Sequence, residues 1–95
     1  MKTIALNIAD PNLNLPLAKS YAERKARQVC GCPMLLAWFN RESGEFSPPV
    51  ECCGDGKPSW LVYAESRGAD LRIDLNGGQY VFVWLCQDPR LTDTV

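Results

Sequence analysis

The stretch that decides the fold is LRIDLNGGQYVFVWL, residues 71–85. Residues 71–75 alternate apolar with charged side chains, which is typical of a strand with one face in water. The Asn76-Gly77-Gly78 run is typical of a tight turn, because these residue types tolerate positive φ. Residues 80–85 are apolar on both faces, which indicates a strand inside a sheet or beneath a partner. The stretch therefore predicts a β-hairpin.

The amino-terminal half supplies a strand, a helix and another strand. Residues 2–8 alternate in the same way, with an apolar residue at every second position, and predict a half-buried strand. Asn14 is suited to cap a helix with Pro16 in its first turn, and Gly31 is suited to end that helix. Residues 33–39 are apolar on both faces and predict an interior strand.

The middle of the chain is less regular. Residues 45–52 could return beside the strand before them, but Pro48 and Pro49 restrict such a return to an edge. Pro58 fits the start of a short helix that stops at Gly68. The order of elements predicts an α+β fold, a small two-layer sandwich with a mostly antiparallel sheet of four or five strands and two helices on one face. We expect one domain over residues 1–87 and a polar tail over residues 88–95.

The composition excludes several classes of function. The chain has 95 residues, 46% of them hydrophobic and 22% charged, which is typical of a folded globular protein. Ten basic against eleven acidic residues give a net charge of −1, so no overall positive field attracts nucleic acid. The chain contains no histidine, which excludes serine triads, Cys-His nucleophile pairs and histidine-ligated zinc.

The five cysteines are the unusual part of the composition. No signal peptide or membrane-spanning run is apparent, so we predict a cytoplasmic protein. In that compartment, clustered cysteines are more often metal-binding or redox-active than permanently bridged. Four of the five form two tight pairs, and the fifth, Cys86, is expected to be a small buried residue that packs. The two pairs are Cys30 with Cys32 and Cys52 with Cys53.

Turn arithmetic gives a reason for the two pairs to meet. If residues 41–44 form a turn, the residues on the two flanking strands face each other when their numbers sum to 85. Cys32 and Cys53 satisfy that sum, and directly opposed residues have Cβ atoms about 4.5–5.5 Å apart. The two prolines could end the pairing before it reaches the cysteines. The predicted site therefore consists of Cys30, Cys32, Cys52 and Cys53.

Three chemistries compete for such a site. Four thiolates could hold zinc or an iron–sulfur cluster, although neither pair has the two-residue gap of a zinc knuckle. Thiol–disulfide exchange is the third, because Gly31 gives backbone freedom and Cys53 precedes a helix whose dipole would lower the thiol pKa. No Cys-x-x-Cys is present, so the chain does not resemble thioredoxin.

The leading hypothesis is a small module with a metal-binding or thiol redox centre. The alternative is a non-catalytic interaction domain that self-associates and has structural cysteines. The apolar face formed by Val81, Val83 and Leu85 suggests a homodimer through the sheet. Asp70 and Asp74 are expected to lie on the wet face of a strand. The basic residues at positions 24, 25 and 27 are expected to form a solvated helix face.

Overall fold

The predicted hairpin forms the centre of a five-stranded sheet. The structure, a computed structural model, describes residues 1–49 and 56–86. Strands β4 (Leu71–Leu75) and β5 (Tyr80–Cys86) pair antiparallel. The turn between them has positive φ at Asn76, Gly77 and Gly78, as the sequence predicted. Asn76 also donates to the carbonyl of Ile8 and accepts from its N–H, so the turn fixes the end of the first strand.

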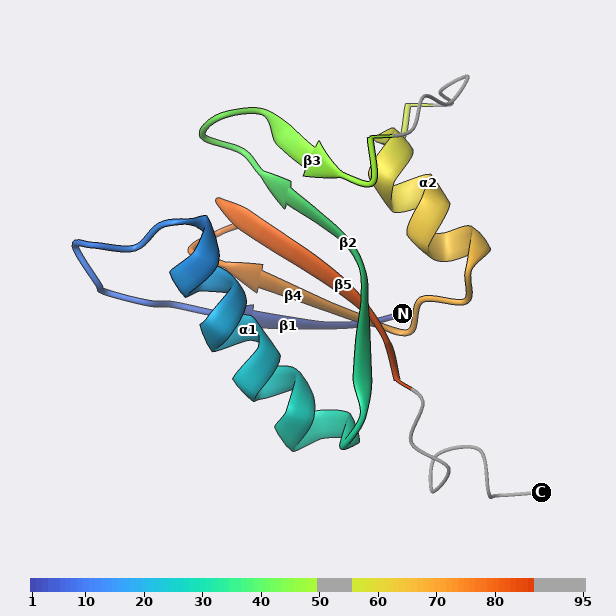
Figure 1. The fold of residues 1–95 in the computed structure, drawn as a ribbon, viewed down its shortest axis with the longest axis horizontal. Helices are drawn as coiled ribbons and strands as arrows, with labels where there is room; N and C mark the ends of the chain where they lie inside the picture. The colour runs from blue at the N-terminus through green and yellow to red at the C-terminus, as the bar shows by residue number, and fades with distance from the viewer. Residues whose placement is uncertain (50–55, 87–95) are drawn as a thin grey trace.

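The other elements follow the predicted order. They are β1 (Lys2–Leu6), α1 (Leu15–Cys30), β2 (Pro33–Asn40), β3 (Glu45–Ser47) and α2 (Ser59–Ser66). The strands lie in the order β1-β4-β5-β2-β3, as Figure 1 shows. Three of the four pairings are antiparallel, and only β1 with β4 is parallel. The α+β class and the mostly antiparallel sheet are confirmed.

The two helices cover opposite faces of the sheet, which corrects the expectation that both lie on one face. Along β5, Tyr80, Phe82 and Trp84 belong to the core cluster that contains α1. Val81 and Val83 belong to a second cluster, which contains α2. Successive side chains of a strand point to opposite faces, so the two clusters lie on either side of β5. A strand that is apolar on both faces needs cover on both, and α2 supplies the second.

Helix α1 forms where its sequence predicts. The side-chain oxygen of Asn14 accepts the Leu17 N–H at 3.0 Å, and proline occupies the first turn. The buried positions recur at every fourth residue, and three of the four are alanines, which allow the helix to approach the sheet closely. These residues are Ala18, Ala22, Ala26 and Cys30. The helix ends at Gly31, the predicted stop.

Two of the three apolar residues that suggested a homodimer are already covered within one chain, and the third, Leu85, is half-buried. Val81 is 2% exposed and Val83 is fully buried, both against α2. The apolar area that a subunit partner would cover is therefore smaller than expected, and the homodimer remains a prediction. Beyond α2 the same sheet face is more polar, and there Arg72 pairs with Asp74 at 2.8 Å. In the described part of the chain, neither helix has the length and apolarity needed to cross a membrane.

Candidate thiol–disulfide site

A disulfide joins Cys30 to Cys86, with 5.6 Å between the two Cα atoms. It connects the last residue of α1 to the last residue of β5. Cys30 is 1% exposed, so its sulfur lies within the core. The two residues are 56 positions apart, and closing a loop of that length stabilises the folded chain by about 4 kcal/mol in the chain-entropy model.

The pairing gives Cys86 a role that the sequence analysis did not. We expected Cys86 to pack alone, and that expectation is wrong. Strand β2 lies antiparallel to β5, and their register places Pro33 opposite Cys86. Cys30 comes three residues before Pro33, so the ladder brings the end of α1 to the end of β5. The sequence indicated both strands, but it did not indicate that they are neighbours in the sheet.

Cys32 lies two residues after the disulfide cysteine Cys30 and is exposed to solvent. It is the free cysteine among residues 1–49 and 56–86. Gly31 has φ 52° and ψ −56°, and the Cys32 N–H donates to the carbonyl of Cys30. This is the geometry of a γ-turn, which glycine adopts without a Cβ clash. Cys30 and Cys32 therefore stand at the two ends of one three-residue turn, with one sulfur buried and the other thiol exposed to solvent.

The register predicted for β2 and β3 is confirmed over three pairs. Trp38 faces Ser47, Phe39 faces Phe46, and Asn40 faces Glu45, and each pair sums to 85. Strand β3 ends at Ser47, immediately before the two prolines. Cys52 and Cys53 lie outside the described residues, so the convergence of the four predicted cysteines remains a prediction.

The disulfide restricts the hypothesis that the four predicted cysteines bind a metal. A sulfur in a disulfide is not a thiolate, so Cys30 could become a ligand for zinc or an iron–sulfur cluster only after reduction. Within the described ranges, no group of three or more cysteine, aspartate or glutamate side chains is arranged to hold an ion.

Asp70 and Trp84 lie beside the disulfide. The Asp70 carboxylate accepts the backbone N–H of Cys86 at 2.8 Å, and the Asp70 N–H donates to the carbonyl of Trp84 at 3.1 Å. Asp70 therefore fixes the end of β5 beside the disulfide and does more than lie on a wet strand face. Trp84 belongs to the same core cluster as both disulfide cysteines, and its side chain is 2% exposed.

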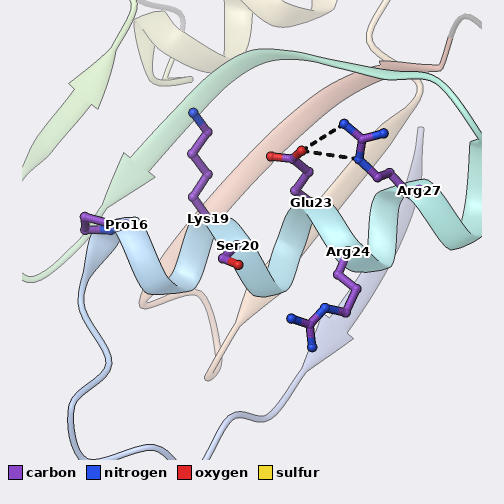
Figure 2. A pocket seen from close by; sticks show the side chains of 6 residues that line it. All are labelled: Pro16, Lys19, Ser20, Glu23, Arg24 and Arg27. Carbon is purple, nitrogen blue, oxygen red and sulfur yellow. Dashed lines mark hydrogen bonds and ion pairs between the residues drawn. The ribbon is translucent and has the colours of Figure 1, made fainter.

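A shallow hollow on the outer side of α1 is the other candidate site. Pro16, Lys19, Ser20, Glu23, Arg24 and Arg27 line it. Figure 2 shows that Lys19 and Arg24 extend to opposite sides of the helix. Arg27 is already paired with Glu23 at 3.0 Å, one helical turn away. Because the positive charges do not converge, this arrangement agrees with the prediction of a solvated helix face.

Known proteins resemble this chain in sequence and in fold. A family model described as "Domain of unknown function (DUF5619)" matches residues 1–84. An uncharacterized protein from Archaeoglobus fulgidus is 38% identical over 74 residues, covering 75% of this chain and 79% of the relative. The crystal structure of a novel protein from the same organism, AF1514, superimposes with a TM-score of 0.78 at 32% identity. That match covers 92% of this chain and 95% of the other.

Proposed function

We propose a function for this chain, which belongs to the DUF5619 family of domains of unknown function. In this proposal the chain is a small thiol–disulfide module whose centre consists of Cys30, Cys32 and Cys86. The observation that carries the proposal is the position of Cys32, an exposed thiol at the other end of the γ-turn that begins at Cys30, the buried end of the disulfide.

The two sulfurs of the disulfide differ in exposure, because Cys30 is buried and Cys86 is half-buried. Cys30 is almost completely buried, so a thiol in solution cannot reach its sulfur along the line of attack that exchange requires. Cys32 is exposed and is separated from Cys30 only by Gly31. A thiolate that is held close to its target reacts far faster than one that must diffuse to it. Cys32 therefore gives the buried Cys30 sulfur a route to the surface, with the half-buried Cys86 as the leaving group.

The exchange starts from the oxidised protein. The Cys32 thiolate attacks the Cys30 sulfur, the Cys30–Cys86 bond breaks, and Cys86 leaves as a thiolate that takes up a proton. A partner thiolate then attacks the Cys32 sulfur of the new Cys30–Cys32 disulfide, and Cys30 leaves and is protonated. A second thiolate of the partner attacks the partner sulfur of this mixed disulfide and regenerates the Cys32 thiolate.

The electrons balance over these steps. The partner dithiol loses two electrons and becomes a disulfide, and the Cys30–Cys86 disulfide gains them and becomes two thiols. Run in reverse, the same steps reduce a partner disulfide. The reaction class is therefore dithiol–disulfide exchange. The reduction potentials of the chain and its partner determine which of the two is oxidised.

The rate of reduction tests the role of Cys32. The oxidised chain is treated with reduced glutathione in a Cys52→Ser/Cys53→Ser background, and the thiols of Cys30 and Cys86 are counted by alkylation and mass spectrometry. We expect Cys32→Ser to slow reduction of the disulfide by about tenfold or more, because the intramolecular route is lost. Equal rates with and without Cys32 would contradict the proposal and leave the disulfide a purely structural bond.

The same experiment includes its control. The Cys52→Ser/Cys53→Ser background should react as fast as the chain with all five cysteines. If that background is the slow one instead, the centre uses the second cysteine pair and the four-cysteine hypothesis is favoured. A metal analysis of the anaerobically reduced chain accompanies it, and stoichiometric zinc or iron would favour the metal site over exchange.

A further inference from the structure

Strand β1 leaves one backbone edge of the sheet open among the described residues. It is the first strand in the sheet order, and only β4 pairs with it. The Lys2 N–H donates to the carbonyl of Asp70 at 3.1 Å, and the Asn76 N–H donates to that of Leu6 at 2.8 Å. Backbone groups of alternate residues point the same way, so Lys2, Ile4 and Leu6 face β4. Thr3 and Ala5 then present their N–H and C=O groups to the outside.

The two edges of the sheet differ in how they are protected. Strand β3 has three residues, and Pro48 and Pro49 follow it directly, which prevents a longer ladder. Strand β1 has five residues and contains no proline and no irregularity in its register. It therefore lacks a proline or a bulge that would stop it from pairing with another chain, and its one charged residue is Lys2.

Positive charge borders this open edge. Lys2 lies on the same face of β1 as Ile4 and Leu6, which pack on the α1 side of the sheet. Figure 2 shows Arg24 extending from α1 toward the side where β1 lies. The Arg24 guanidinium lies over the ring of Tyr21, and Lys25 follows Tyr21 by one helical turn, so Lys25 lies on the same side of the helix.

These charges are available to a partner. The ion pairs within the described ranges use the basic residues Arg27, Lys57 and Arg72, and none includes Lys2, Arg24 or Lys25. Residues 1–9 contain no aspartate or glutamate. The edge is thus locally basic in a chain whose net charge is −1.

We propose that the open edge of β1 binds an extended segment of a partner polypeptide with acidic side chains at alternate positions. The segment adds a sixth strand through the backbone groups of Thr3 and Ala5, and its acidic residues face Lys2, Arg24 and Lys25. This surface is independent of the cysteine centre. A second copy of the chain fits less well, because pairing β1 with itself would bring two basic borders together.

Binding of a short peptide tests the proposal. The probe is a capped, fluorescently labelled peptide that alternates glutamate and threonine, and its counterpart replaces glutamate by lysine. We expect saturable binding of the glutamate peptide by fluorescence anisotropy, and affinity lower by about tenfold or more for the lysine peptide. No saturable binding of the glutamate peptide would overturn the proposal.

Two variants separate the backbone contribution from the charges. Ala5→Pro removes an N–H that points away from β4, so the fold should persist while affinity drops by about tenfold or more. Arg24→Glu/Lys25→Glu reverses two charges on α1, removes the contact of Arg24 with the Tyr21 ring, and should weaken binding to a similar degree. If both folded variants bind as tightly as the unaltered chain, the site is not at this edge. A dimer in sedimentation that Ala5→Pro dissociates would show that a second copy occupies the edge, and would also overturn the proposal.

Discussion

The two faces of β5 are covered in different ways. On one face α1, a capped helix of sixteen residues, packs over Phe82 and most of the large buried side chains. On the other face α2, eight residues long and without a side-chain cap, covers Val81 and Val83. The α1 face also carries the disulfide at its corner. The comparison indicates that most of the stability and the candidate chemistry lie on the α1 face.

The largest effect of a core substitution is expected on the α1 face. Phe82 is fully buried at the centre of that core. Phe82→Ala should lower the free energy of unfolding by about 3–5 kcal/mol, because it removes an aromatic ring and leaves a cavity. Chemical denaturation followed by circular dichroism measures the change. A loss below about 1 kcal/mol would show that the α1 face is not the main core.

A smaller effect is expected from the neighbouring residue on the α2 face. Val83 is as deeply buried as Phe82 but belongs to the smaller cluster. Val83→Ala should cost about 2 kcal/mol, since it removes two methyl groups at about 0.8 kcal/mol each and leaves a small cavity. The same denaturation experiment compares the two variants directly. If Val83→Ala costs more than Phe82→Ala, the ranking of the two faces is reversed.

The smallest effect concerns the start of α1. Asn14→Ala removes the side-chain acceptor of the Leu17 N–H and should cost about 1 kcal/mol. Asn14→Ser keeps a side-chain oxygen that can accept the same N–H and serves as the matched control. Thermal unfolding monitored by circular dichroism should show a lower midpoint for Asn14→Ala than for this control. Equal midpoints would show that the cap does not stabilise α1.

The elements of this fold could be predicted because their patterns are local. The alternation in residues 71–75, the turn at Asn76 and the cap at Asn14 each depend on a few adjacent residues. The sheet face that α2 covers could not be predicted. The apolar residues of α2 do not gather on one side of the helix, and its contacts with the sheet involve residues far away in the sequence. Because β5 is apolar on both faces, something had to bury each face. The sequence of β5 did not show whether the second face is buried by a helix of the same chain or by another subunit.

The candidate site was partly predictable for the same reason. Cys30 and Cys32 stand out by their spacing around Gly31, and the register of β2 with β3 follows from one turn. Cys86 could not be assigned, because its partner depends on β5 lying next to β2 in the sheet. Asp70 was missed as well, since its contact with the Cys86 N–H appears only when both ends of the hairpin are in place.

The role of Cys32 in the exchange is tested most directly by the identity of the first sulfur that forms a mixed disulfide. The oxidised chain, in the Cys52→Ser/Cys53→Ser background, is mixed with reduced glutathione, quenched with acid at short times and mapped by mass spectrometry. If Cys32 mediates the exchange, the first adduct is on Cys32, with Cys86 already present as a thiol. A first adduct on Cys86 or Cys30, with Cys32 unmodified, would contradict this role.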